Sequence, residues 1–192
     1  RDVAVTGVQT CALPISGTLL NQAIREAHAG GLGFGQGVSA FVAGLRPRFA
    51  ELSLLASAHR LGVPVTVHVA IGTDIIHMHP SASGEAIGAT SLRDFRYFTS
   101  SVSRLGGGVY LNCGSAVILP EVFLKAVALV RNQGNRLEGM TTVNLDFVRL
   151  YRPQTNVVTR PVAGTGGQGY SLVGPHELLI PLLAAAILDR VN

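Results

Sequence analysis

Three short strand-type segments recur along the chain, the first of them dense in β-branched residues, and segments with helical spacing of apolar residues lie between them. The strand-type segments are PVTVHVAI (64–71), VYLNC (109–113) and TTVNLDF (141–147). Alternation of helix-type and strand-type segments is typical of a sheet whose strands run parallel. We therefore expect an α/β fold built on a parallel sheet.

The helical segments are predicted from apolar residues at i, i+3 and i+4. Asp94 is expected in the first turn of one of them, where its negative charge is favourable near the positive end of the helix dipole. The apolar run 178–188 is about half the roughly 20 residues that a bilayer requires, so it predicts a buried helix. The expected helices are 18–29, 49–60, 91–105, 119–132 and 176–191, with a glycine-rich stop at 30–37 and loops at 74–89 and 148–174.

Residues 1–16 (RDVAVTGVQTCALPIS) resemble a translated sequencing adapter. The stretch 5–15 matches such an adapter codon by codon, and it lacks the basic start and continuous apolar core of a signal peptide. We therefore leave this segment out of the fold prediction. Residues 17–192 are expected to be the C-terminal part of a longer α/β domain whose N-terminal part is missing.

Composition narrows the class of protein. With 47% hydrophobic and 14% charged residues, the chain is too apolar to be disordered. Outside the adapter-like segment Cys113 is the only cysteine, so no intrachain disulfide is expected and a cytoplasmic location is predicted. The net charge of +4 comes mostly from arginines that are scattered and not interleaved with aromatic residues. Neither a nucleic-acid partner nor a membrane partner is expected.

Four segments follow a predicted strand or precede a predicted helix, which is where open α/β sheets bind ligands. The first contains His77 and His79, which point to the same side in extended backbone and, with Asp74, are a candidate zinc site. The alternative is that both are loop histidines bonded to backbone groups. His68, within the strand-type segment, is expected to be a core histidine.

The second segment is the turn Asn112-Cys113-Gly114-Ser115, whose free N–H groups suit a phosphate or carboxylate, although a plain tight turn is an equal alternative. Cys113 is interpreted as a small core residue in preference to a nucleophile. Glu121, in the next helix, is a candidate acid or base, or a partner of the helix dipole.

The third segment places Thr142, Asn144 and Asp146 on one strand face, where buried polar groups need partners such as a ligand. Solvation at a sheet edge is the alternative. In the fourth, Gly174 precedes His176 and Glu177, which either bind an anion or sugar hydroxyl or cap the last helix. The stretch GTGGQG (164–169) lacks the lysine of a phosphate-binding P-loop and is interpreted as a flexible connection.

Several of these stretches together resemble the deoxyhypusine synthase-like family of NAD/FAD-binding Rossmann-type domains, including bacterial relatives. The matching stretches are 63–65 leading to Thr73-Asp74, the strand, glycine turn and helix of 109–132 ending in Arg131-Asn132, and Ile180-Pro181-Leu182-Leu183. The resemblance implies a Rossmann-like parallel sheet with helices on both faces, an NAD site over the strand ends, and a homo-oligomer, namely a tetramer. The residues expected to hold the cofactor are Gly72, Thr73, Asp74, Asn112, Gly114, Ser115, Asn144, Asp146, Gly174, His176 and Glu177.

The chain departs from the family at the lysine that forms an imine with the substrate. The matching position is Val117 or Glu121, and Lys125 lies one helical turn further on. The polyamine-binding acidic loop is replaced by the basic stretch 151–161, which favours an anionic small-molecule substrate.

The sequence therefore predicts an NAD-using, deoxyhypusine synthase-like transferase with a different substrate, in which His77, His79 and Glu121 are the acid–base candidates. A noncatalytic nucleotide- or anion-binding module is the alternative. A metal-dependent hydrolase that uses His77 and His79 is a third, less favoured hypothesis.

Overall fold

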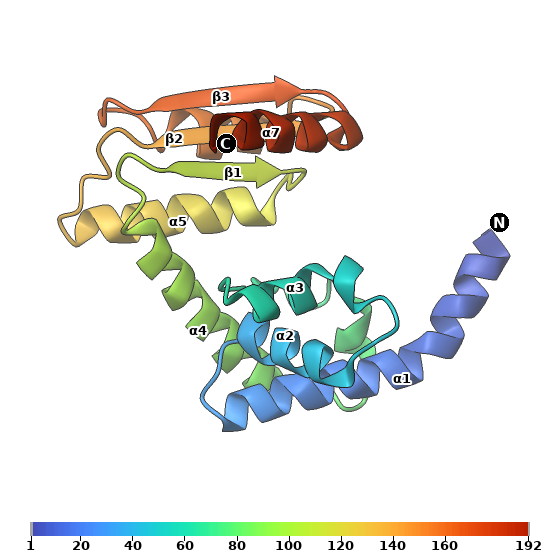
Figure 1. The fold of residues 1–192 in the computed structure, drawn as a ribbon. Coiled ribbons are helices and arrows are strands. Elements are labelled where there is room, and N and C mark those ends of the chain that lie inside the picture. The colour runs from blue at the N-terminus through green and yellow to red at the C-terminus, as the bar shows by residue number, and fades with distance from the viewer. Residues whose placement is uncertain (1, 192) are drawn as a thin grey trace. The chain divides into compact units, whose positions relative to one another are not determined.

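The computed structural model describes residues 2–191 of the backbone and the side chains of residues 16–191. The fold is mixed α/β, with helices and a three-stranded parallel sheet. The chain divides into two compact units, residues 1–97 and 98–192, and the boundary falls inside the helix α4 (Gly84–Val102). Each unit is considered by itself (Figure 1).

In the described part of the first unit, all regular secondary structure is helical. The expected helices 18–29 and 49–60 are present, although the second is split into a 3-10 turn and a short α-helix that ends, as predicted, at Gly62 with φ of +66°. The predicted loop 74–89 contains a 3-10 turn and the start of α4. The elements are α1 (Asp2–Ala29), α2 (Phe34–Leu45), η1 (Ala50–Leu52), α3 (Leu54–Leu61), η2 (Ile75–Met78) and α4 (Gly84–Val102).

The glycine run 30–37 ends α1, as predicted, but it also begins α2, which the sequence patterns did not predict. The glycines of α2 allow close contact with neighbouring segments. A Cβ at Gly37 would lie 2.2 Å from Ala27 Cβ of α1, and a Cβ at Gly35 would lie 2.2 Å from the carbonyl oxygen of Val65. Packing therefore outweighs the low helix propensity of glycine here. The core that results contains Ala23, Ile24, Phe34, Val38, Ile76, Ala86 and Ile87.

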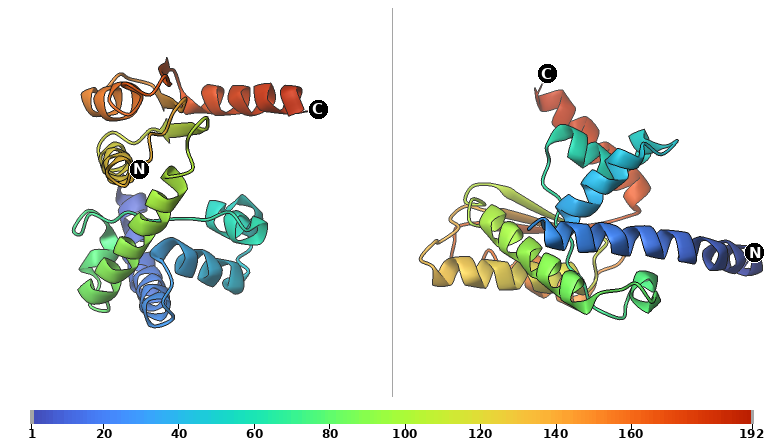
Figure 2. Two further views of the ribbon diagram at one scale, coloured as in Figure 1. Left: turned by 90° about the vertical axis from the view of Figure 1, so that its left-hand side faces the viewer. Right: turned by 90° about the horizontal axis from the view of Figure 1, so that it is seen from below.

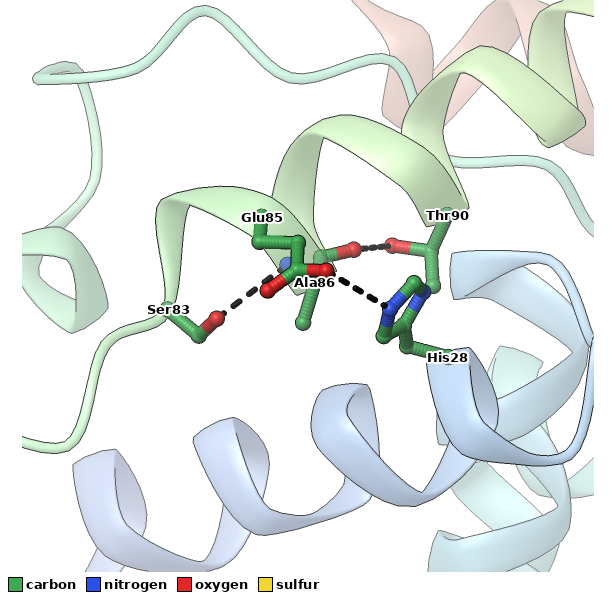
Figure 3. A network of polar contacts seen from close by, with 5 residues as sticks. All are labelled: His28, Ser83, Glu85, Ala86 and Thr90. Carbon is green, nitrogen blue, oxygen red and sulfur yellow. Dashed lines mark hydrogen bonds and ion pairs between the residues drawn. The ribbon is translucent and has the colours of Figure 1, made fainter.

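The start of α4 is fastened to the end of α1 (Figure 3). Ser83 caps α4 by accepting a hydrogen bond from the Ala86 N–H, and Thr90 donates to the Ala86 carbonyl at 2.7 Å. His28 of α1 lies 3.7 Å from the Glu85 carboxylate. The first turn of α4 thus has both a local cap and a contact with α1.

The prediction that residues 64–71 form a strand of the sheet is wrong. The segment belongs to no strand in the described part of the chain. Two of its N–H groups are bound by side chains of α4 instead, because Val67 donates to Asp94 at 2.8 Å and Val69 donates to Ser91 at 3.2 Å. The expected position of Asp94 in a first turn is also wrong, since α4 begins ten residues earlier at Gly84 and Asp94 is fully buried.

The second unit contains the sheet, with strands β1 (Val109–Cys113), β2 (Thr141–Asp146) and β3 (Gln168–Val173) in the order β1-β2-β3. All pairs are parallel, with Asn112 opposite Asn144 and Asn144 opposite Ser171. The predicted strands 109–113 and 141–147 are confirmed. The predicted loop 148–174 is wrong, because it contains α6 (Tyr151–Pro153), a π-helical segment η3 (Gln154–Thr159) and β3.

Helix α5 (Ile118–Asn132) and η3 cover one face of the sheet, here called the covered face. Phe123 of α5 is fully buried, and its ring stacks on that of Tyr110 of β1 at 3.6 Å between ring centroids. Thr142 of β2 donates to the Val157 carbonyl of η3 at 2.7 Å. Both contacts anchor a helical segment to the sheet.

Helix α7 (His176–Val191) begins on the other side of the sheet (Figure 2). The predicted helix 176–191 is confirmed, but its predicted burial is wrong, because none of its described residues is buried. Only its start is held at the sheet, where His176 Nε2 lies 3.0 Å from the Leu145 carbonyl oxygen. In the described residues, no helix has the combination of length and apolar character needed to span a membrane.

Candidate functional site

A row of polar side chains crosses the covered face near the carboxyl ends of the strands. Asn112, Asn144 and Ser171 are aligned by the strand register, one from each strand. Asn112 Nδ2 donates to Asn144 Oδ1 at 2.7 Å and to the Ser115 carbonyl at 2.9 Å. The row therefore connects β1, β2 and the turn that follows β1.

Two atoms of this row lack hydrogen-bond partners. Asn112 Oδ1 and Ser171 Oγ are both buried and unpaired. A buried polar atom without a hydrogen-bond partner reduces the stability of the fold by about 1–3 kcal/mol. Such atoms are therefore uncommon unless a ligand or a water molecule forms a hydrogen bond with them. The unpaired oxygens lie at the two ends of the row, on the two outer strands.

Asp146 lies on the same face as the row, where β2 ends. Its side chain is buried, and Oδ1 accepts a hydrogen bond from the Phe147 N–H at 2.8 Å. The prediction that Thr142, Asn144 and Asp146 share one buried face is confirmed. Thr142 is satisfied by η3, which leaves Asn144 and Asp146 as the candidates for a ligand.

The turn after β1 has the tight geometry expected of Gly114. Its φ is +68°, its N–H donates to the Leu145 carbonyl at 3.0 Å, and a Cβ there would lie 3.0 Å from the His176 ring. Ser115 Oγ accepts from the Leu119 N–H at 3.2 Å, which caps α5, since Val117 at its N-cap position offers no polar side chain. Gly114 and His176 therefore lie close together at the carboxyl edge, and Ser115 beside Gly114 caps α5.

Glu121, in the first turn of α5, is already engaged. Its Oε1 accepts a hydrogen bond from Asn156 Nδ2 at 2.7 Å and lies 3.6 Å from Arg152 Nε.

The sequence patterns missed Asn156 and Ser171, because both lie in the region predicted as a loop. Gly174 follows β3, Glu177 is exposed in the first turn of α7, and Lys125 is exposed on α5.

Cys113 was expected in the core, but its side chain is exposed. Its residue position places it on the face opposite the polar row, because it pairs with Leu145. Partial desolvation raises the pKa of the Cys113 thiol above its ordinary value. The thiolate is therefore scarce at neutral pH, and this environment does not favour a nucleophile.

The remaining candidates, Gly72, Thr73, Asp74, His77 and His79, lie in the first unit. His77 Nδ1 accepts from the N–H groups of Gly72 at 3.1 Å and Asp74 at 3.3 Å. Asp74 Oδ1 in turn accepts from the Ile76 N–H. These bonds form a capping arrangement that orders the loop before η2.

His79 is engaged at both ring nitrogens. Nδ1 lies 2.7 Å from Ser81 Oγ and accepts from the Ser81 N–H, and Nε2 lies 3.3 Å from Thr18 Oγ1 of α1. Within residues 16–191, no three histidine, cysteine, aspartate or glutamate side chains gather closely enough to hold a metal ion.

His68 is half-buried and lies 3.1 Å from Thr66 Oγ1. Burial lowers its pKa, and the nearby Asp94 charge partly opposes that effect.

The second unit is thus a parallel α/β domain with an incompletely satisfied polar row at the carboxyl edge of its sheet. Neither a protein-family model, nor a curated protein, nor a solved structure matches the chain. Its function is therefore inferred from its own residues.

Proposed function

We propose that the chain is an NAD-binding enzyme of the deoxyhypusine synthase-like type, and that the cofactor lies at the polar row Asn112-Asn144-Ser171. The observation that carries this proposal is the pair of buried, unpaired oxygens at the ends of the row. A parallel α/β sheet binds ligands at this edge.

The donor set fits a dinucleotide. Ser171 Oγ can donate or accept, and Asn112 Oδ1 can accept, which matches ribose hydroxyl and carboxamide groups. The N–H groups at the start of the 15-residue α5, reached through the tight turn at Gly114, suit a diphosphate. NAD, when bound, supplies a hydride acceptor, while the chain orients it and excludes water.

The substrate is proposed to differ from that of the synthases. In the resemblance to that family, either Val117 or Glu121 matches the position of the imine-forming lysine, and Lys125 is exposed. Without an amine at that position, an imine has no nucleophile. Arg152, about half exposed beside Glu121, is proposed to attract an anionic substrate.

Calorimetric titration of the chain with NAD tests the proposal, using Ser171→Ala as the probe variant. Because Ser171 Oγ has no partner, its removal is expected to leave the free energy of unfolding nearly unchanged while weakening NAD binding roughly 5–30-fold, as for loss of one hydrogen bond. Ser103→Ala, a serine outside the row, is the matched control. Absence of NAD binding to the unaltered chain, or equal affinity in Ser171→Ala, rejects the proposal.

A noncatalytic nucleotide-binding module is the second candidate, and the engagement of Glu121 by Asn156 and Arg152 favours it. This candidate predicts that NAD binds without being reduced in the presence of any tested anionic alcohol or amine. Cofactor reduction, followed by absorbance, would support the enzyme instead.

A further inference from the structure

The loops that precede the three strands lie together at the amino edge of the sheet, the edge opposite the polar row (Figure 1). Backbone hydrogen bonds join each loop to its neighbour. The Gly107 N–H donates to the Glu138 carbonyl at 2.9 Å, and the Gly139 N–H donates to the Thr165 carbonyl at 2.9 Å. All of these residues belong to the second unit, so the amino edge is built within one compact unit.

Two adjoining cavities lie between these loops. The first cavity, of about 510 Å³, lies between the loop before β1 and the loop before β2. The second cavity, of about 410 Å³, lies between the loop before β2 and the loop before β3. Both volumes are within the range of about 300–1,000 Å³ that is usual for small-molecule sites. Arg136 and Glu138 line both cavities, so the loop before β2 separates the two.

The cavities have a positive excess of charge. Among the described residues, three arginines line them, Arg104 in the first, Arg131 in the second and Arg136 in both, whereas Glu138 is the one carboxylate. The carboxyl-terminal ends of α4 and α5 lie at this edge and contribute about half a negative charge each. These helix ends are too weak to cancel the arginines, so the cavities favour an anion.

The loop that carries Arg136 is ordered by its own contacts. Asn135 donates to the Ser103 carbonyl and accepts a hydrogen bond from the Leu137 N–H at 3.1 Å. Leu137 is buried and has a φ of +53°, a conformation that is uncommon for a leucine and persists where the surrounding structure fixes it. Because the backbone is already fixed, binding a ligand requires little further ordering of this loop.

The arginine side chains at the two cavities have different degrees of engagement. Arg131 is oriented by donating a hydrogen bond to the Pro161 carbonyl. Arg136 Nη1 lies 3.7 Å from Glu138 Oε1, which is too long for a hydrogen bond. The Arg136 guanidinium can therefore donate to a closer acceptor, and its planar shape matches two oxygens of one phosphate group.

We propose that the two cavities form one binding site for a small molecule with a phosphate group at each end, as in a sugar bisphosphate. Arg104 binds the phosphate in the first cavity, Arg131 binds the phosphate in the second, and Arg136 contacts both. A phosphate group offers three acceptor oxygens and more than one negative charge, which suits an excess of arginines better than a carboxylate does. The ligand is bound apart from the proposed NAD site, which lies at the carboxyl edge.

Calorimetric titration of the whole chain with fructose 1,6-bisphosphate tests the proposal. Fructose 6-phosphate is the comparison, because it has the same sugar with a single phosphate. The bisphosphate is expected to bind at least about 10-fold more tightly, since only this compound fills both cavities with an anionic group. Absence of bisphosphate binding, or equal affinity for the two compounds, overturns the proposal.

Substitutions of opposite effect at the shared loop show whether the anion binds there. Arg136→Gln is expected to weaken bisphosphate binding about 10-fold, as for the loss of a charged donor, whereas Glu138→Gln is expected to strengthen binding because it removes a competing carboxylate. Arg60→Gln, at an arginine of α3, is the matched control and is expected to bind normally. Circular dichroism establishes that each variant is folded. Unchanged affinity in Arg136→Gln, or no gain in Glu138→Gln, contradicts the proposed site.

The outcome is distinguishable from that of the NAD titration, because the two sites use different residues. Ser171→Ala, the probe of the NAD site, is expected to bind the bisphosphate as tightly as the unaltered chain. Loss of bisphosphate binding in Ser171→Ala would mean that the bisphosphate binds at the carboxyl edge, and the proposed second site would be wrong.

Discussion

The side chain of Asn112 donates a hydrogen bond to Asn144 Oδ1 across 2.7 Å, from one strand to the next. The two residues are also paired in the backbone register of β1 and β2. The sheet is thus joined at this point by a buried side-chain bond as well as by its ladder. Because Ser171 continues the row without being bonded to it, stability and ligand binding can be separated by substitution.

Asn144→Ala is expected to reduce the free energy of unfolding by about 1–3 kcal/mol, since it removes a buried hydrogen bond and leaves part of the Asn112 amide less satisfied. Urea denaturation followed by circular dichroism measures the effect. Ser171→Ala is the control, with an expected change below about 0.5 kcal/mol. A larger loss in the serine variant would show that Ser171 Oγ has a structural partner.

Two glycines of α2 are expected to respond in opposite directions to the same substitution. Gly35→Ala should destabilise by at least about 2 kcal/mol, because its Cβ would lie 2.2 Å from the Val65 carbonyl oxygen and backbone must move. Gly44→Ala, where a Cβ meets no atom within 4 Å, should stabilise by about 0.5–1 kcal/mol through helix propensity. Thermal unfolding of both variants checks the pair, and equal effects would contradict the close packing of α2.

Stability is expected to fall as the pH rises through the titration of Asp94. Burial raises the pKa of this carboxyl above its ordinary value, despite hydrogen bonds from Gly35 and Val67 that lower it. At pH values between the pKa of Asp94 in the unfolded state and its higher pKa in the folded state, the native state binds more protons than the unfolded state. The contribution of Asp94 to the free energy of unfolding is therefore greatest below this pH range and is lost above it. Urea denaturation at a series of acidic pH values, compared with Asp94→Asn, measures the contribution.

Asp94→Asn is a favourable comparison because one oxygen, Oδ2, accepts both backbone hydrogen bonds. An amide oxygen can keep both bonds while the titrating charge is removed. The variant is expected to lose this part of the pH dependence and to retain its fold at neutral pH. If the slope with pH is the same in both proteins, another group is responsible.

A second pH window is expected on the alkaline side. The pKa of Tyr110 is raised from an ordinary value of 10.0 to about 12, mainly because the side chain is buried and to a smaller extent because of the nearby charge of Cys113. The folded state therefore keeps its proton where the unfolded state loses it, and stability falls as the pH rises from about 10. Relative to Tyr110→Phe, the unaltered chain should lose about 1 kcal/mol by pH 11, measured by urea denaturation. Parallel curves for the two proteins would contradict this assignment.

Strand β1 was predictable because a short, mostly apolar run lies between Gly108 and Gly114, and β2 because Thr141, Thr142 and Val143 are β-branched, whereas β3 was not predictable. The segment Gln168–Val173 contains Gly169, and glycine in a sequence is typical of loops and turns. The fold requires it, since a Cβ there would lie 1.9 Å from the Val158 carbonyl oxygen of η3. The same limitation applies to α2, whose glycines are selected by tertiary contacts and not by local propensity.

The candidate site was predictable only where alternation within a strand was visible. Alternation placed Asn144 and Asp146 on one buried face, and the strand end pointed to Asn112. Ser171 depends on a strand that was not predicted, and Asn156 reaches Glu121 from a helical segment 35 residues away. Such distant pairings follow from three-dimensional packing and leave no signal in the spacing of residues.

The carboxylate of Asp94 has a consequence for the order in which the first unit folds. A single oxygen holds the N–H of Gly35 at the start of α2 and that of Val67 in the extended segment, while its own backbone lies in α4. If α4 packed against only one of the other two segments, the Asp94 carboxylate would be buried with only one of its two backbone hydrogen bonds. We therefore expect the three to assemble in one concerted event, with a transition state in which residues 35, 67 and 94 are already near one another.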